Sequence, residues 1–350
     1  MVIRTIAMLL LASLLFSLAL CIGCGDEGDE SLPYGPPQVH FPEDEGAHPE
    51  MLTEWWYGNF ALTDSEGGEY GAMLAYFNSG PRILSLSDVE AEHFYPEVSI
   101  SIPDYAQGTL DLRWGSDDHW FRKDPDSLTY RLESYGDEIG LNLDLSSRKP
   151  HLLVSGDGLI EWTYGSSYYY SLTRLQVEGQ IELSGEVIDV EGIGWMDHQW
   201  MNFLTELAER DYDWFSVQLD NDTELIFWQI VNRDGSVESF DLTIMFADNS
   251  VYHTQDIALE RMDSWVSTQT GNEYGVLWRV REETHDLDLE IRARYSEQEI
   301  IVFETPEATF AFWEGGTTVS GHLDGEAVTG TGYAELVQFP AGMPAEAPHP

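Results

Sequence analysis

Asp197 and His198 stand next to each other in the stretch from Trp195 to Trp200, and their types suit acid–base chemistry. A carboxyl group kept out of water holds its proton more tightly, because burial disfavours the charged form. Asp197 could therefore act as a general acid, with His198 orienting Asp197 or a water molecule. Tryptophan π-faces could shelter a developing cation, each worth roughly 2 kcal/mol when desolvated. The candidates for this lining are Trp55, Trp56, Trp195, Trp200 and Trp214.

The same side chains also have a structural interpretation. In a strand that closes a barrel, Asp197 and His198 could fix the register or cap a following helix by accepting backbone N–H bonds. Glu335 occupies the position of Asp197 in a second copy of the motif, and a duplicated acid favours a role in the fold. The sequence leaves both interpretations open.

Two further acids, Glu54 and Asp213, each precede a tryptophan. An acid in such a place often pairs with an arginine, and Arg174 is a candidate partner for one of them. A buried pair of this kind would set specificity more than stability.

Other chemistries lack their motifs. The ten histidines are scattered, without a closely spaced pair or a His-Glu-x-x-His motif, so no metal site is predicted. A Gly-x-Ser-x-Gly elbow and a phosphate-binding loop are missing as well. Proton transfer by Asp197 needs no cofactor, and none is predicted.

Strands must position these residues. Short runs rich in aromatic and branched residues are broken by Gly, Asp-Gly and Asn-Asp turn signals every 8–15 residues, which is typical of an all-β sandwich or barrel. Helical periodicity is convincing only from Asn202 to Glu209. The clearest runs are Tyr57 to Leu62, Tyr70 to Phe77, Leu141 to Leu145, Tyr168 to Val177, Phe215 to Leu219 and Glu224 to Val231.

A weak internal repeat indicates a duplicated domain. The stretch from Glu54 to Phe60 resembles that from Asp213 to Leu219, with an acid, a tryptophan and an aromatic residue in the same order. Later, Val-x-Gly-x-Gly-aromatic-x-acid occurs twice and ends at Asp197 and at Glu335. Each half thus has an opening and a closing motif, and we expect its first and last strands to pair and close a barrel.

Alternation along these strands divides the aromatic residues between two faces. Trp55 and Trp56 must point to opposite sides of their strand, so one belongs to a core while the other is available to a cavity or a second barrel. Tyr168, Tyr169 and Tyr170 divide in the same way, and Tyr170 is a candidate cavity contact.

The chain has 350 residues and is 43% hydrophobic, which is enough for two cores. We place two barrels at 47–203 and 204–340, after a signal peptide at 1–23 and a tether at 24–46. Residues 341–350, rich in proline and alanine, form a flexible tail.

The formal net charge of −47 excludes nucleic acid as a partner, because the chain repels phosphate backbones. Attraction to an anionic bilayer is excluded for the same reason. Acids spread along the whole chain indicate adaptation to a salty milieu, where counter-ions screen the self-repulsion. A specific acidic cation site is the sharper alternative.

The N-terminus reads as a secretory signal: Arg4, an apolar run from Ile6 to Ile22, and then a charged boundary. The chain's only cysteines, Cys21 and Cys24, lie at the end of this run, so a disulfide framework is not expected. Gly23-Cys24-Gly25 resembles a bacterial lipoprotein site. We expect Cys24 to carry a lipid that anchors the protein to the cell envelope. A conventional signal cleaved beyond both cysteines is the alternative.

Several of these motifs together resemble the carotenoid 1,2-hydratase (hydroxyneurosporene synthase) and AttH-like family, from about residue 40 to 340. The matching stretches run from His48 to Tyr57, Tyr168 to Leu175, Gly194 to Trp200, Asp213 to Ser216 and Gly332 to Leu336. The resemblance implies two lipocalin-like (calycin) antiparallel β-barrels in tandem, with a short helix near their junction. It also implies a hydrophobic, isoprenoid or lipid-like ligand between them.

Two functions follow from this resemblance. The first is a cofactor-independent hydratase that protonates an alkene through Asp197, with His198 assisting. The second is a non-catalytic lipid carrier on the same fold. In either case the ligand contacts are expected at Glu54, Trp55, Trp56, Tyr57, Tyr170, Arg174, Trp195, Trp200 and Trp214.

Overall fold

The computed structural model describes residues 37–115, 118–162, 164–203, 210–305 and 309–338. The predicted signal peptide, Cys24, the first part of the tether, residues 204–209 of the expected helix and the tail therefore lie outside the described residues. Within the described ranges, no helix has the length and apolar character needed to span a bilayer.

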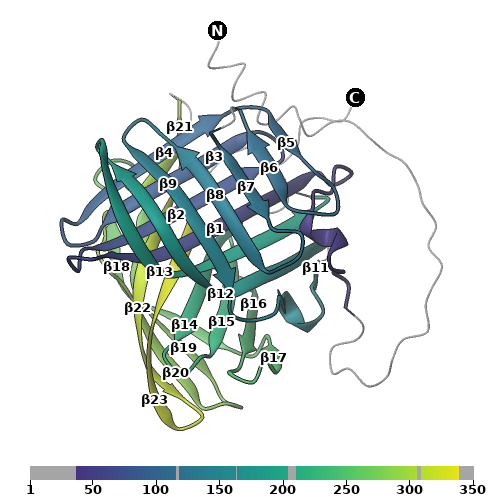
Figure 1. Cartoon of the computed structure of the whole chain (residues 1–350). Helices are drawn as coiled ribbons and strands as arrows, with labels where there is room; N and C mark the ends of the chain where they lie inside the picture. The colour runs from purple at the N-terminus through teal and green to yellow at the C-terminus, as the bar shows by residue number, and fades with distance from the viewer. Residues whose placement is uncertain (1–36, 116–117, 163, 204–209, 306–308, 339–350) are drawn as a thin grey trace.

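The first half of the described chain forms an antiparallel sheet of 13 strands (Figure 1). Two short strands, β10 (Leu152–Leu153) and β11 (Leu159–Trp162), pair with β12 beside the main path. The order along the main path is β4 (His93–Ile100), β3 (Pro81–Asp88), β2 (Glu69–Phe77), β1 (Thr53–Asp64), β13 (Glu186–Met201), β12 (Gly165–Leu183), β9 (Ile139–Ser147), β8 (Thr129–Tyr135), β7 (Trp120–Lys123), β6 (Asp111–Trp114) and β5 (Pro103–Tyr105).

The second half forms another antiparallel sheet, of 10 strands, in which β21 (Glu299–Glu304) pairs with β22 beside the main path. Short 3-10 helices lie at η1 (Glu43–Glu45) and η2 (Val154–Gly156). The order along the main path is β17 (Val251–Thr254), β16 (Val237–Met245), β15 (Glu224–Asn232), β14 (Arg210–Leu219), β23 (Glu326–Gln338), β22 (Thr309–Leu323), β20 (Leu287–Ala293), β19 (Glu273–Glu282) and β18 (Ala258–Val266).

The internal repeat corresponds to equivalent strands in the two sheets. The opening motif forms β1 in one sheet and β14 in the other, while the closing motif forms β13 and β23. As expected, the first strand of each half pairs with the last, and Tyr57 lies opposite Asp197 while Trp214 lies opposite Glu335. This pairing lies inside each strand order, which ends at β4 and β5 in the first sheet and at β17 and β18 in the second, so it does not close a barrel as predicted.

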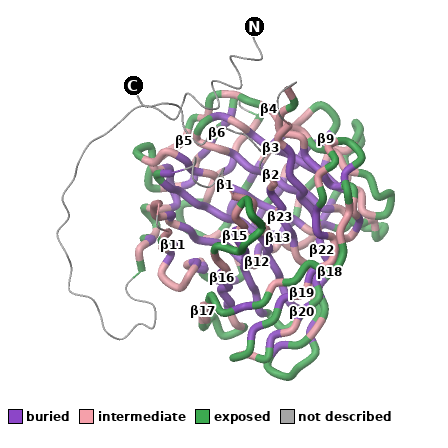
Figure 2. Tube along the Cα trace, turned by 180° about the vertical axis from the view of Figure 1, so that it is seen from behind, coloured by how far each residue is buried: buried purple, intermediate pink, exposed green. Residues whose placement is uncertain are grey.

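Each sheet curls around a core of its own, and a third buried layer fills the space between the two sheets. We call this third layer the inter-sheet layer, and we call the side of β1, β12 and β13 that faces the first core the inner face. Where β1 and β13 are covered on both sides they are buried, which holds for most of β1 and for residues 194–201 of β13 (Figure 2). The inter-sheet layer includes Tyr57, Tyr169, Trp195, Trp214, Trp228, Phe312 and Tyr333.

Residues 37–46 are part of the folded structure, so the prediction of a tether reaching to residue 46 is wrong for this stretch. Val39 is buried against Tyr170 and Trp200, and Glu45 of η1 is buried as well. The Glu45 carboxylate contacts His151 Nε2 at 3.0 Å and Lys123 Nζ at 3.5 Å. These apolar and ionic contacts hold the segment on the first sheet.

Candidate active site

Asp197 and His198 are neighbours in the sequence but point to opposite sides of β13. Asp197 lies in the inter-sheet layer with Trp195, whereas His198 lies on the inner face with Met196 and Trp200. Asp197 accepts hydrogen bonds from Ser171 and Trp195, whereas His198 bonds to Glu54, so the expected orientation of Asp197 by His198 is wrong. The strand therefore carries two separate polar centres.

The carboxyl group of Asp197 is 2% exposed and accepts several hydrogen bonds. Its Oδ1 receives the Ser171 hydroxyl at 2.5 Å and the Trp195 indole N–H at 2.7 Å. The Tyr169 hydroxyl also bonds to the carboxyl group. Burial raises the pKa of Asp197 to about 7, although these three donors act against the increase. Asp197 is thus about half protonated at neutral pH.

Two further carboxyl groups, Glu314 on β22 and Glu335 on β23, lie in the same layer and directly opposite each other in the strand pairing. Tyr57 donates to Glu314 at 3.3 Å, and Tyr212 donates to Glu335. Burial raises the pKa of both acids, and repulsion from Glu335 carries that of Glu314 further up. Glu335 also adds to the increase at Asp197. Neither glutamate has a lysine or arginine ion pair within the described residues.

The repeat relates these acids. Asp197 lies opposite Ser171 of β12, and Glu335 lies opposite Glu314 of β22. A serine that hydrogen-bonds an acid in one half is thus replaced by a second acid in the other half. Sequence reasoning identified Glu335 but missed Glu314, and the strand pairing of the duplicated motif is the signal that could have found it.

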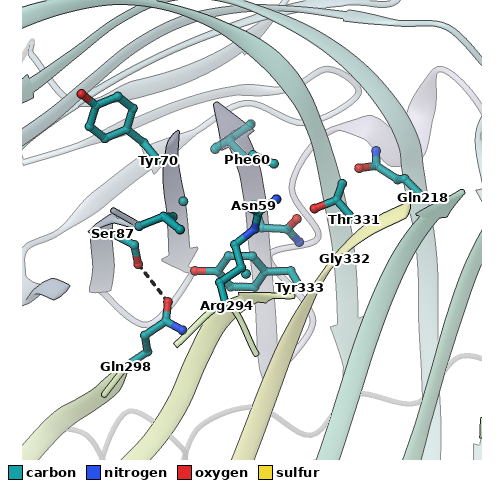
Figure 3. A pocket seen from close by; sticks show the side chains of 14 residues that line it. Asn59, Phe60, Tyr70, Ser87, Gln218, Arg294, Gln298, Thr331, Gly332 and Tyr333 are labelled. Atoms are coloured by element: carbon teal, nitrogen blue, oxygen red, sulfur yellow. Dashed lines mark hydrogen bonds between the residues drawn. The ribbon is translucent and has the colours of Figure 1, made fainter. Parts of the chain in front are cut away.

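A small cavity of about 20 Å³ is lined by residues of both sheets (Figure 3). This volume suits one water molecule. Asn59 lines the cavity and donates to both the Tyr57 hydroxyl and the Ser216 hydroxyl at 3.4 Å. Because Tyr57 in turn donates to Glu314, a polar chain leads from the cavity to the carboxyl pair. Other lining residues are Ser87, Gln218, Arg294, Gln298, Thr331 and Tyr333.

A second, open groove of about 510 Å³ lies at a distant part of the first sheet. Its walls include Trp114, His119 and the Arg82–Glu97 ion pair. Asp197 and His198 line neither of these two hollows. Both side chains are instead buried among packed neighbours, with Trp56 stacked on His198 and Trp195 bonded to Asp197.

The polar centre on the inner face is built around Glu54 of β1, which is fully buried. Its Oε1 lies 2.8 Å from both His48 Nδ1 and His198 Nε2, and the His48 backbone N–H donates to Oε2 at 2.9 Å. Burial alone would raise the pKa of Glu54, but these hydrogen bonds outweigh it and lower the pKa. Glu54 is therefore a buried carboxylate held by two imidazoles.

The two imidazoles of this centre differ in their protonation. Burial favours neutral His48, yet hydrogen bonds to Asp44 and Glu54 raise its pKa to about 9. At His198, by contrast, burial outweighs the hydrogen bond to Glu54 and lowers the pKa. His48 thus carries the positive charge that balances Glu54.

Most of the other predicted contacts divide between these two centres. Trp56 stacks on His198 with ring centroids 4.8 Å apart, and Trp200 stacks on His48 at 4.0 Å. Tyr170 packs edge-on against His198. The inter-sheet layer holds Tyr57, Trp195 and Trp214, with half-buried Trp55 at its edge. Trp55 and Trp56 therefore lie on opposite faces, as predicted.

Arg174 contacts neither Glu54 nor Asp213, so that predicted pairing is wrong. The Arg174 guanidinium instead binds Glu224 of the second sheet and the carbonyl oxygen of Leu219 at 2.7 Å. Lys149 Nζ reaches the same Glu224 at 2.6 Å. These contacts tie the two sheets together. Arg174 lies in a bulge of β12, where the pairing with β13 shifts register between Leu172 and Leu175.

Two curled antiparallel sheets that meet along a buried aromatic layer define a tandem lipocalin-like protein. The family model of AttH-like proteins matches residues 33–338, and the chain belongs to this family. The predicted family and the predicted all-β, lipocalin-like fold are thereby confirmed.

Solved structures share the arrangement. An AttH homologue from Nitrosomonas europaea is 25% identical, with a TM-score of 0.77 over 86% of this chain and 97% of that chain. Kievitone hydratase from Nectria haematococca is 15% identical, with a TM-score of 0.72 over 89% and 94%. CghA with Sch210972 is 12% identical, with a TM-score of 0.59 over 83% and 89%. The comparison with curated proteins found no match.

Proposed function

We propose that this protein is a cofactor-independent hydratase acting on an alkene in a hydrophobic, isoprenoid or lipid-like ligand between the two sheets. One observation carries the proposal: Asp197, Glu314 and Glu335 are buried in one aromatic layer, and the described residues include no lysine or arginine paired with any of them. Carboxyl groups in this setting keep protons that can be transferred. The fold similarity to kievitone hydratase supports the same class.

The reaction would begin with transfer of the Asp197 proton to one alkene carbon. A C–H bond forms as the π bond breaks, and the other carbon becomes a cation. The rings of Trp195 and Trp214 would stabilise this cation from the layer they share with Asp197. Water then forms a C–O bond with the cation and returns a proton to the Asp197 carboxylate, so the acid is regenerated.

The small cavity would be the place for that water. Its polar lining includes Asn59, Gln218 and Tyr333, and its volume of about 20 Å³ excludes the hydrocarbon part of a ligand. The ligand would therefore enter by parting the sheets along the inter-sheet layer. Ligand binding would displace aromatic packing that the empty protein makes with itself.

Turnover of defined alkenes tests this function. Purified protein in high salt is incubated with isoprenoid alkenes, and the product is detected by mass spectrometry as the mass of one added water. We expect Asp197→Asn to abolish turnover while ligand affinity stays within a few-fold. Asp189→Asn, an exposed acid on the same strand, is the matched control and should retain full activity. Unchanged turnover in Asp197→Asn would contradict the proposed role.

A lipid carrier is the second candidate, and the hydrogen bonding of Asp197 favours it. Donors from Ser171, Trp195 and Tyr169 satisfy this carboxyl group in the way expected of a structural acid. In that case Asp197→Asn would lower stability and ligand binding together, and no substrate would turn over. Lipid extraction of protein from its own host, followed by mass spectrometry, would identify a carried ligand.

We further propose that a lipid on Cys24 anchors the protein to the cell envelope. Incorporation of radiolabelled fatty acid should occur in the wild type and in Cys21→Ser, and should be lost in Cys24→Ser. Label retained in Cys24→Ser would contradict the assignment. The net charge of −47 supports a salty working milieu, and far-UV circular dichroism should show the fold weakening in dilute buffer.

A further inference from the structure

The inner face of the first sheet brings together three side chains that are far apart in the sequence. His48 Nδ1, Glu54 Oε1 and His198 Nε2 all lie within 4.8 Å of one another. Antiparallel pairing of β1 with β13 produces this meeting, because Trp56 lies opposite His198 and Glu54 lies two residues further along the same face. The chain after η1 then brings in His48.

We propose that His48, Glu54 and His198 form a binding site for a divalent transition metal ion of the Zn²⁺ type. Two imidazole nitrogens and one carboxylate oxygen are a donor set that Zn²⁺ uses where a fourth position stays open. The same set also suits other first-row ions such as Co²⁺. No metal site was predicted here, because the two histidines are 150 positions apart and no short motif joins them.

The surroundings of the three donors fix their orientation. Trp200 stacks on the His48 ring with a 9° angle between the planes, and Trp56 stacks on His198 at 22°. Asp44 Oδ1 lies 3.3 Å from His48 Nε2, the ring nitrogen that points away from Glu54. A carboxylate on the far nitrogen of a metal-binding histidine is the usual outer partner of such a ligand.

The second histidine can present a lone pair from the required nitrogen. His198 Nδ1 has no hydrogen-bond partner among the described residues, while Nε2 faces Glu54. In the empty protein the Glu54 carboxylate accepts the proton of Nε2, and because Nδ1 has no partner the ring proton can move to Nδ1 when Nε2 binds an ion. Which nitrogen holds the proton follows from its partners.

The site has an access side and a charge that favours a cation. The side chains of Glu54 and His198 are fully buried, whereas those of His48 and Asp44 are 12% and 21% exposed. An ion can thus reach the three donors past His48. Within the described ranges, histidines are the only basic groups in ion pairs with Glu54 and Asp44, so an ion would take over the neutralisation of two carboxylates.

Metal titration tests the site directly. Full-length protein is stripped with a chelator and titrated with Zn²⁺ by calorimetry, in high KCl with excess Mg²⁺ so that binding to surface acids is suppressed. We expect one ion per chain and a loss of affinity of at least tenfold in His48→Ala. His40→Ala removes an exposed histidine of the same segment and should bind as the wild type does. Equal binding by wild type and His48→Ala would overturn the proposal.

A second measurement identifies the donors without relying on one variant. Co²⁺ bound by histidine in a four-coordinate site absorbs visible light strongly, and we expect this absorption in the wild type and its loss in His48→Ala. Asp44→Asn, which removes only the outer partner, should weaken Zn²⁺ binding by about 10- to 100-fold. A spectrum of hydrated Co²⁺ in the wild type would overturn the proposal.

The metal-site proposal can be tested separately from the proposed hydratase activity. Asp197 lies on the other face of β13, so Asp197→Asn should bind Zn²⁺ with unchanged stoichiometry. Loss of turnover in that variant with retained Zn²⁺ binding would separate the two centres experimentally.

Discussion

Glu54 and Asp197 are two buried carboxyl groups on paired strands of one sheet, yet their pKa values move in opposite directions. On the inner face, two imidazoles hold Glu54 and lower its pKa. In the inter-sheet layer, Asp197 receives neutral donors and lies near Glu335, and its pKa rises to about 7. Burial acts to raise the pKa of both groups, so their different hydrogen-bonding and charged partners decide the direction of the net shift.

This difference assigns separate tasks to the two faces of β13. A carboxylate that stays charged is suited to holding a cation, whether that cation is the proton on His48 or a metal ion. A carboxyl group that is half protonated at neutral pH is suited to giving and taking protons. Neighbouring positions on a strand can thus serve different chemistry, because alternation sends them into different surroundings.

Removing Glu54 should have the largest effect on stability. Glu54→Ala leaves the imidazoles of His48 and His198 without their carboxylate, and we expect a loss of about 5 kcal/mol in the free energy of unfolding. Denaturant unfolding at constant salt measures it. Glu50→Ala, an exposed acid of the same segment, should change stability by less than about 0.5 kcal/mol. A loss below about 1 kcal/mol for Glu54→Ala would contradict the role given to the inner face.

At Asp197, unlike at Glu54, the raised pKa should make the stability of the folded protein decrease as the pH rises. Its pKa is higher in the folded protein than in the unfolded chain, so its stabilising contribution is complete below about pH 4 and is lost as the pH rises to about 7. Relative to Asp197→Asn, the wild type should lose up to about 4 kcal/mol over this range. Unfolding curves of both proteins at several pH values measure the difference. A wild type that becomes more stable relative to Asp197→Asn as the pH rises would have the opposite sign and would refute the comparison.

The carboxyl pair of the second sheet should show coupling of intermediate size. In a double-mutant cycle at neutral pH, Glu314→Gln and Glu335→Gln should each relieve repulsion, with a coupling energy of about 2 kcal/mol. A cycle of Glu314→Gln with Glu326→Gln, an exposed acid on β23, should give additive values. Additivity in both cycles would show that Glu314 and Glu335 do not interact.

The hydrogen bond from Tyr57 to Glu314 should contribute the least. Tyr57→Phe removes one neutral donor, and we expect a loss of about 1 kcal/mol in the free energy of unfolding at neutral pH. The same substitution interrupts the polar chain from Asn59, so the turnover rate should fall by more than the loss of folded protein explains. Stability and turnover reduced in parallel would restrict Tyr57 to a structural role.

The sequence was sufficient for the features that depend on periodicity. Alternation separated Trp55 from Trp56, and the duplicated motifs predicted the pairing of β1 with β13 and of β14 with β23. Both features are local or repeated, so they can be derived from residue order alone. Asp197 was recognised for the same reason, since it closes a repeated motif.

Contacts between distant segments could not be derived in this way. The pairing of Arg174 with Glu224, instead of Glu54 or Asp213, depends on how the two sheets are placed. Glu314 has no distinctive neighbours in the sequence, and its importance comes from Glu335 across the strand pair. His48 was part of a recognised motif, but only the folded chain shows that it meets His198.

Lys149 has a consequence for studying how the sheets separate. It is one of only two lysines, and its amine is enclosed by Glu224 and by the carbonyl oxygens of Asp222 and Phe246, all from the second half of the chain. The other lysine, Lys123, is held beside Glu45 within the first half. Acylation of Lys149 by an amine-specific reagent should therefore proceed only when the two halves part. The acylation rate of Lys149, measured by peptide mapping relative to that of Lys123, would report how often the two halves separate to admit a ligand.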